Sequence, residues 1–140
     1  MNVTALMPVK GFRNAKQRLS SLLGGAAREL LAETMFRDIL RQVRLARGLA
    51  GTFVVTGDDQ VAAIAAMAGA GVIRESAENG ETSAVDCARL ELKQAGCEAV
   101  LILPGDMPLV RARDVEQILA QVPDSARAPF ALLVPSHDRL

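Results

Sequence analysis

Short apolar runs alternate along this chain with longer segments of helical period, and this alternation constrains the fold more than any other feature. It is typical of a parallel sheet wrapped by helices, so we predict an α/β fold. The expected strands are Val3 to Met7, Thr52 to Thr56, Val72 to Arg74, Val100 to Leu103 and Phe130 to Val134.

The longest helical segment has apolar residues mainly three and four positions apart between Leu30 and Val43. This spacing predicts one buried stripe on a long helix. Arg37, Arg41 and Arg44 fall largely outside the stripe. We interpret these three arginines as a solvated face and not as a site.

Three further helices are expected at about 58 to 68, 83 to 95 and 112 to 122. Asp58 or Asp59 can cap the first, because a carboxylate accepts hydrogen bonds from the free N–H groups of a first helical turn. The expected stops are Gly69 and Gly71 for the first helix, Gly96 for the second and Pro123 for the third.

Length and charge indicate one compact domain with a small ligand site. The chain has 140 residues, half of them apolar, with 16 basic and 16 acidic side chains. This balance argues against nucleic acid as a partner, because binding to phosphate backbones requires a broad basic face. The absence of Trp and Tyr also removes the stacking platforms that single strands use.

Cysteine and histidine are too few for a disulfide framework or a zinc site. Cys87, Cys97 and His137 are the only such residues, and no CxxC pair occurs. No apolar run approaches the roughly 18 residues of a membrane span, and no secretory segment is apparent. We expect a cytoplasmic protein with reduced thiols and no membrane partner.

The loop after the first strand carries Lys10, Arg13, Lys16 and Arg18, four cations within nine residues. Ligands of open parallel sheets bind outside the carboxyl ends of the strands. The glycine patterns GxxxxGK[ST] and GxGxxG are both absent, so cationic side chains would replace glycine amides as phosphate binders. The alternative is a solvated basic turn.

A second unusual loop, PGDMPL at residues 104–109, follows the strongly apolar strand AVLIL. It would project from the same edge of the sheet as the basic loop. Pro104, Gly105 and Pro108 hold Asp106 on a short loop, and Mg²⁺ suits such a carboxylate because it takes one or two protein carboxylates together with phosphate oxygens. The alternative is an ordinary turn.

These two loops resemble motifs of one family. PVKGFRNAKQRLS resembles the PVKxxxxAKxRL signature of the CofC-type guanylyltransferases, and PGDMPL resembles their Asp-Pro-Leu metal loop. The resemblance extends from residue 2 to about 138 and implies a three-layer, Rossmann-like sheet of GT-A type. Family members join GTP to 2-phospholactate, phosphoenolpyruvate or 3-phosphoglycerate in deazaflavin coenzyme biosynthesis, and pyrophosphate leaves.

The resemblance also implies roles for individual residues. Lys10, Lys16 and Arg18 would hold the GTP phosphates and Asp106 would hold Mg²⁺, with Lys10, Arg18 and Asp106 as the catalytic groups. Such transfers rely mainly on positioning and charge neutralisation. The full expected set of nucleotide-binding residues is Pro8, Val9, Lys10, Lys16, Arg18, Gly80, Thr82 and Ser83.

Two segments depart from the family pattern. Residues 79–88 read NGETSAVDCA where many relatives have a Gly-Leu-Asn turn. Gly80 fits a close approach of the backbone to the nucleotide, whereas Thr82 or Ser83 could reach the base or, as the favoured alternative, cap the next helix.

The second departure is that relatives continue past the fifth strand into an acceptor-binding segment, whereas this chain ends at Leu140. We therefore expect a single domain over residues 1–140, either a C-terminal truncation or incomplete on its acceptor side, that binds Mg-GTP but transfers GMP slowly or not at all. The alternatives are a related nucleotidyltransferase with another acceptor and a non-catalytic nucleotide-binding remnant. The oligomeric state is open, with a homodimer as one alternative.

Overall fold

The computed structural model describes residues 1–13, 15–75 and 81–124, and at residues 81 and 82 it describes the backbone alone. The elements in chain order are β1 (Val3–Pro8), the short 3₁₀ helix η1 (Gln17–Leu19), α1 (Gly25–Leu45), β2 (Leu49–Thr56), α2 (Asp59–Met67), β3 (Gly71–Arg74), α3 (Glu81–Gln94), β4 (Ala99–Ile102) and α4 (Ala112–Ala120). The predicted strand Phe130 to Val134 lies outside the described residues.

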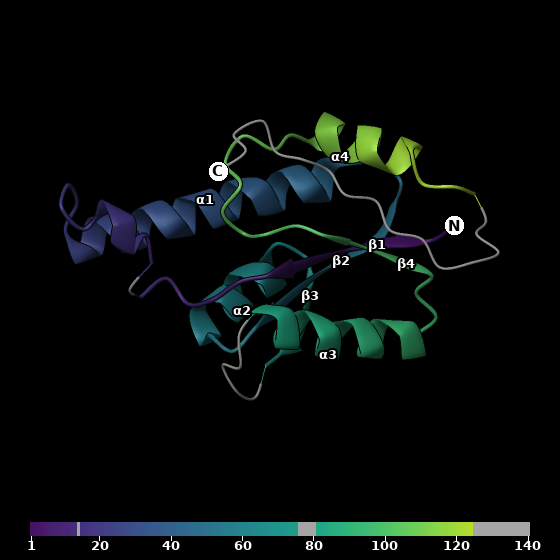
Figure 1. The fold of residues 1–140 in the computed structure, drawn as a ribbon, viewed down its shortest axis with the longest axis horizontal. Helices are drawn as coiled ribbons and strands as arrows, with labels where there is room; N and C mark the ends of the chain where they lie inside the picture. Colours follow the sequence, from purple (N-terminus) through teal and green to yellow (C-terminus); the bar gives the residue numbers. More distant parts are fainter. Residues whose placement is uncertain (14, 76–80, 125–140) are drawn as a thin grey trace.

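The four described strands form one sheet in the order β3-β2-β1-β4, and every neighbouring pair is parallel. Helices α1, α2 and α4 contribute to the core on one face of the sheet, and α3 packs on the other face. Figure 1 shows α1 and α4 on one side of the strands and α3 on the opposite side. The three-layer α/β prediction is therefore confirmed for this part of the chain.

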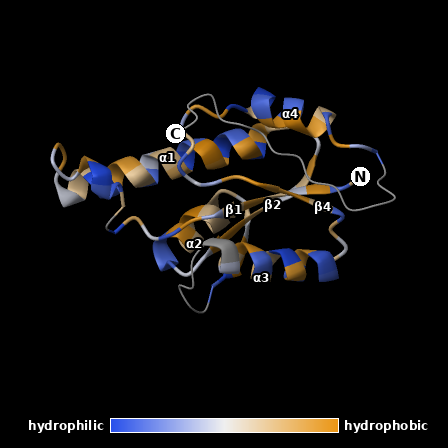
Figure 2. Ribbon diagram, viewed as in Figure 1, coloured by the Kyte–Doolittle hydropathy of each residue, from blue (hydrophilic) through white to orange (hydrophobic). Residues whose placement is uncertain are grey.

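Strand β1 lies at the centre of this core, and all six of its residues are buried. Ala5 and Met7 belong to the cluster under α1, whereas Leu6 belongs to the cluster under α3, as the alternation of a strand requires. Figure 2 shows hydrophobic residues along the strands and hydrophilic residues on the outer side of α4. A strand covered on both faces needs a nearly continuous apolar run, and β1 has one, with the buried Thr4 as its single polar residue.

The buried stripe predicted on the long helix is confirmed. Its fully buried residues are Phe36, Ile39, Leu40 and Val43. Arg37, Arg41 and Arg44 are exposed, as expected of a solvated face. The helix begins at Gly25, earlier than Leu30, because its first turn extends beyond the core and carries no apolar stripe.

Helix α2 begins after Asp58, whose Oδ1 accepts a hydrogen bond from the Val61 N–H at 2.9 Å, so Asp58 and not Asp59 is the cap. Strand β2 begins three residues before the predicted Thr52, because its pairing with β1 continues back to Leu49 opposite Val3.

Within the described residues, no helix is long and apolar enough to cross a membrane.

Candidate functional site

The basic loop and the Asp106 loop leave the sheet side by side. Strands β1 and β4 are parallel neighbours, so their carboxyl ends lie at one edge. The ladder continues one residue into each loop, because the Val9 N–H donates to the Val55 carbonyl at 3.0 Å and the Leu103 N–H donates to the Leu6 carbonyl at 3.0 Å. Both loops therefore start from fixed points, and the predicted common edge is confirmed.

Phe12 anchors the basic loop to the core. It is 5% exposed, and its ring centroid lies 6.0 Å from that of Phe36 on α1. Its neighbour Gly11 is half-buried, and Arg13 is exposed. This anchor limits how far the loop can move, and sequence reasoning missed it, although a lone aromatic residue between cations was a signal.

Lys16 has a left-handed backbone, with φ 55° and ψ 40°. It is the single non-glycine residue with positive φ in the described part of the chain. This conformation costs a non-glycine residue about 1–2 kcal/mol, and such strain clusters at functional sites. The turn that follows is held by the Leu19 N–H, which donates to the Lys16 carbonyl at 2.9 Å.

The Lys16 side chain reaches across to the second loop. Its Nζ lies 3.6 Å from Oδ2 of Asp106, with the lysine side chain 21% exposed and the aspartate side chain 66% exposed. An ion pair this exposed contributes little to stability, about 0–1 kcal/mol. Its importance is positional, because it joins the two loops that the sequence singled out.

Gly105 packs the Asp106 loop directly against the basic loop. A Cβ at this position would lie 2.7 Å from Cγ2 of Val9 and 3.5 Å from Cδ1 of Phe36. Only glycine allows this approach without a displacement. The sequence suggested a turn role for Gly105, whereas the structure shows that close packing between loops is also required.

A third loop, after β2, also contributes to this edge. A Cβ at Gly11 would lie 2.6 Å from Oδ2 of Asp58, so the basic loop rests on the carboxylate that caps α2. Arg74, at the end of β3, donates from Nη1 to the Asp58 carbonyl at 3.2 Å. Sequence reasoning assigned Asp58 a capping role alone, although its place after a strand end was a signal for the edge.

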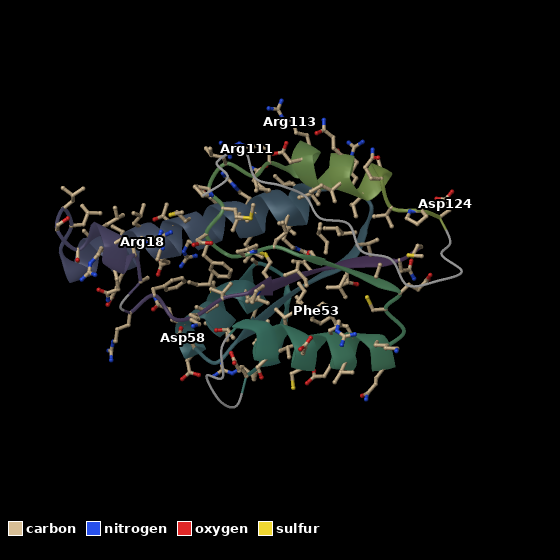
Figure 3. The ribbon with its side chains drawn as sticks, in the orientation of Figure 1. Arg18, Phe53, Asp58, Arg111, Arg113 and Asp124 are labelled. Atoms are coloured by element: carbon tan, nitrogen blue, oxygen red, sulfur yellow. The ribbon has the colours of Figure 1, made fainter. Side chains whose placement is uncertain are left out.

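The other predicted residues of the basic loop lie where the sequence placed them. Pro8 is buried at the end of β1 and Val9 is half-buried. Lys10 and Arg18 are exposed, and among the described residues no ion pair joins either of them to a carboxylate. Figure 3 shows Arg18 at the same end of the molecule as Asp58. The structure thus brings together Lys16 and Asp106 and leaves Lys10 and Arg18 open to solvent.

The capping role of Thr82 or Ser83 was wrong. Helix α3 begins at Glu81, so both residues lie inside its first turn, and the cap position precedes them. Ser83 is exposed. Gly80 and the position of the cap lie outside the described residues.

A metal ion could be held here only with help from a ligand. Within the described residues, no group of three or more His, Cys, Asp or Glu side chains could hold one. Asp106 offers a single exposed carboxylate. This suits Mg²⁺, which accepts one or two protein carboxylates and takes its other oxygens from water and phosphate.

Comparison with known proteins identifies the family. The family model described as "Guanylyl transferase CofC like" matches residues 3–130. The chain is 31% identical over 135 residues to the phosphoenolpyruvate guanylyltransferase of Conexibacter woesei, covering 96% of this chain and 60% of the relative. It is 37% identical over 120 residues to the 3-phospho-D-glycerate guanylyltransferase of Phenylobacterium zucineum, covering 82% of this chain and 54% of the relative. The chain thus spans little more than half the length of these relatives.

Solved structures show the same fold. A protein from Desulfovibrio desulfuricans described as a nucleotide-diphospho-sugar transferase matches with a TM-score of 0.68 and 20% identity, covering 86% of this chain and 54% of that chain. A cytidylyltransferase from Leptospira borgpetersenii matches with a TM-score of 0.61 and 17% identity, covering 87% and 49%. The Rossmann-like prediction is confirmed by these likenesses. Since the family model extends over nearly the whole sequence, this chain belongs to the CofC-like guanylyl transferase family.

Proposed function

We propose that this chain binds GTP together with Mg²⁺ at the carboxyl edge of its sheet and serves GMP transfer to a small phosphorylated acid. One observation carries the proposal: Lys16 Nζ and Asp106 Oδ2 lie 3.6 Å apart although they come from loops far apart in the sequence. A cation and a carboxylate side by side suit a triphosphate with a divalent ion, since phosphate oxygens bind the first and the metal binds the second.

The relatives supply the acceptor class. Their names specify phosphoenolpyruvate, 3-phospho-D-glycerate and, in Methanothermobacter thermautotrophicus, 2-phospho-L-lactate. All three are small acids that carry one phosphate. The proposal includes a role in deazaflavin coenzyme biosynthesis and a cytoplasmic location, and it leaves open which of the three acids is used.

The proposed reaction needs charge neutralisation and alignment. An oxygen of the acceptor phosphate attacks the α-phosphorus of GTP, the bond from that phosphorus to the bridging oxygen breaks, and pyrophosphate leaves. Lys16, with Lys10 and Arg18 on the same loop, would neutralise the triphosphate, and Asp106 would hold the metal. Bound Mg²⁺ would supply further charge stabilisation at the phosphate oxygens. Phe12 and Gly105 would keep the two loops aligned, and alignment is a large part of such catalysis.

The nucleotide half of the proposal is tested by Asp106→Asn. We expect wild type to bind Mg-GTP in a calorimetric titration and the variant to lose most of this metal-dependent affinity. Its melting temperature should stay nearly unchanged, because the side chain is 66% exposed. Asp124→Asn is the matched control, since Asp124 is an exposed acid at the opposite end of the molecule (Figure 3). Equal Mg-GTP binding by Asp106→Asn and wild type would contradict the metal role.

The transfer half is tested by mass spectrometry. The chain is incubated over a long time course with Mg-GTP and each of the three acids in turn, because the sequence predicts slow transfer, and even a slowly formed guanylylated acid together with pyrophosphate is the supporting result. Binding of Mg-GTP without any adduct would contradict transfer and favour a nucleotide-binding function alone.

A further inference from the structure

We propose that Asp58 is a positioning residue for the triphosphate. Its carboxylate supports the basic loop at Gly11 and so holds the neighbouring Lys10 where it can reach the phosphates. This role comes in addition to the cap that Asp58 provides for α2. The inference rests on the proposed function, because it concerns the loop that would bind the triphosphate.

The contact between Gly11 and Asp58 carries the inference. A Cβ at position 11 would lie 2.6 Å from Oδ2 of Asp58 and 3.2 Å from its Cγ. Gly11 is not one of the described glycines with positive φ, which are Gly48, Gly69 and Gly96. Its lack of a side chain therefore serves the close approach to Asp58 and not an unusual backbone conformation.

Asp58 is itself held in place by hydrogen bonds. Its Oδ1 accepts from the Val61 N–H at 2.9 Å, and its own N–H donates to Oγ1 of the buried Thr56 at 3.1 Å. Arg74 Nη1 donates to the Asp58 carbonyl at 3.2 Å. One carboxylate oxygen is thus engaged in the cap while Oδ2 faces the basic loop, so turning the carboxylate away from Gly11 would break the cap.

Further contacts fix the loop on either side of Gly11. The Val9 N–H donates to the Val55 carbonyl at 3.0 Å, and the Phe12 side chain is buried in the core. Lys10 lies between these fixed points with an exposed side chain. The support at Gly11 therefore determines where the Lys10 side chain starts, and a binding group that is already held in place loses less freedom when it meets its ligand.

The shape of Asp58 and not its charge would perform this role. A carboxylate near the loop repels a triphosphate, so its charge does not favour binding. Asn has nearly the same shape and caps helices as well as Asp does. We therefore expect Asp58→Asn to bind Mg-GTP at least as well as wild type. Asp58→Ser retains a cap but lacks the oxygen that reaches Gly11, so it should bind Mg-GTP more weakly.

The test is a double-mutant cycle measured by calorimetry with Mg-GTP. Gly11→Ala and Asp58→Ser should each weaken binding about 3- to 10-fold, because the first displaces the loop and the second removes its support. In the double variant the new methyl group fills the space that the carboxylate leaves, so affinity should return to within about twofold of wild type. A role in capping α2 alone predicts no such recovery, and Asp58→Ser should melt close to wild type because serine also caps.

Gly51→Ala is the matched control, since its Cβ would lie an ordinary 3.6 Å from Cε2 of Phe53 near the start of β2. It should leave Mg-GTP affinity unchanged. The inference would be overturned if Asp58→Ser bound Mg-GTP like wild type, if the double variant recovered nothing, or if Asp58→Asn were as weak as Asp58→Ser. None of these results would affect the proposed function, which Asp106→Asn tests separately. If wild type bound no Mg-GTP, the proposed function and this inference would both be overturned.

Discussion

Two regions of this molecule gather cations, and they do so in different ways. One is the carboxyl edge of the sheet, where the basic loop meets Asp106. The other is a groove of about 490 Å³ between α1 and α2. The groove is lined by Arg37, Leu40, Arg41, Arg44, Leu45, Ile64, Met67 and Ala68.

In the groove, two of the three arginines pair within their own helix. Arg37 Nε lies 3.2 Å from Glu33 Oε2, and Arg41 Nη2 lies 3.7 Å from Asp38 Oδ1. Such pairs follow from helical spacing alone and are worth a few tenths of a kcal/mol, on the order of 0.3–0.5. They need no tertiary structure, and their backbone is ordinary helix.

At the sheet edge, the pair joins two different loops and one partner has a left-handed backbone. This arrangement exists only once the sheet has formed, and it is maintained against local strain. The comparison teaches that the edge pair depends on tertiary structure and on a left-handed backbone, whereas the groove pairs depend on helical spacing alone.

Among the single substitutions that test this comparison, Gly105→Ala should have the largest effect on stability and on Mg-GTP affinity. The added Cβ would lie 2.7 Å from Cγ2 of Val9, a β-branched side chain with little freedom to turn away. We expect a loss of about 1–3 kcal/mol in the free energy of unfolding and a marked loss of Mg-GTP affinity. Chemical denaturation and calorimetry measure the two effects.

Gly25→Ala is the matched control, because its Cβ would meet only Arg28 Nη2 at an ordinary 3.8 Å. It should be neutral or slightly stabilising. If Gly105→Ala were as stable as Gly25→Ala and bound Mg-GTP normally, the close packing of the two loops would be irrelevant to the site.

Neutralising the open cations of the basic loop should have the next largest effect. Lys10→Ala and Arg18→Ala should each weaken GTP binding about tenfold and affect guanosine much less, since they would contact phosphates and not the base. Lys93→Ala and Arg113→Ala remove exposed cations from α3 and α4 and should change neither affinity. Equal losses for GTP and guanosine would indicate a folding defect instead.

A smaller effect should appear at the strained position. Lys16→Gly relieves the left-handed conformation, whereas Lys16→Ala keeps the Cβ that causes the strain. We expect the glycine variant to be about 0.5–1 kcal/mol more stable than the alanine variant, with both losing triphosphate affinity. Thermal unfolding compares them, and equal stability would show that position 16 is not strained.

The smallest effect should come from the groove. Arg41→Ala removes an exposed pair within one helix, so the free energy of unfolding should change by less than about 0.5 kcal/mol. GTP affinity should not change. A loss of GTP affinity in this variant would favour the groove over the sheet edge as the GTP-binding site.

The features that the sequence predicted depend on local periodicity and on one rule of topology. The stripe on α1 is visible because apolar residues repeat at helical spacing, and Asp58 is a recognisable cap. The meeting of the two loops follows from parallel strands, whose carboxyl ends share an edge. None of these inferences requires the exact contacts of a side chain.

The features that the sequence did not predict depend on contacts between distant residues. The left-handed backbone of Lys16 and the packing of Gly105 on Val9 are set by tertiary geometry. The early start of β2 reflects pairing with β1 and not local propensity. The wrong cap at Thr82 or Ser83 arose because helix boundaries shift by one or two residues from any local signal.

The central claim is that the sheet edge, and not the groove, binds the triphosphate, and one calorimetric comparison tests it most directly. Lys16→Met with Arg18→Met removes two cations from the edge, and Arg37→Met with Arg41→Met removes two from the groove. We expect the edge pair to reduce Mg-GTP affinity about 100-fold, at about tenfold for each lost charge, and the groove pair to leave it within about twofold of wild type. An edge variant that binds Mg-GTP like wild type, or a groove variant that loses as much as the edge variant, would contradict the claim.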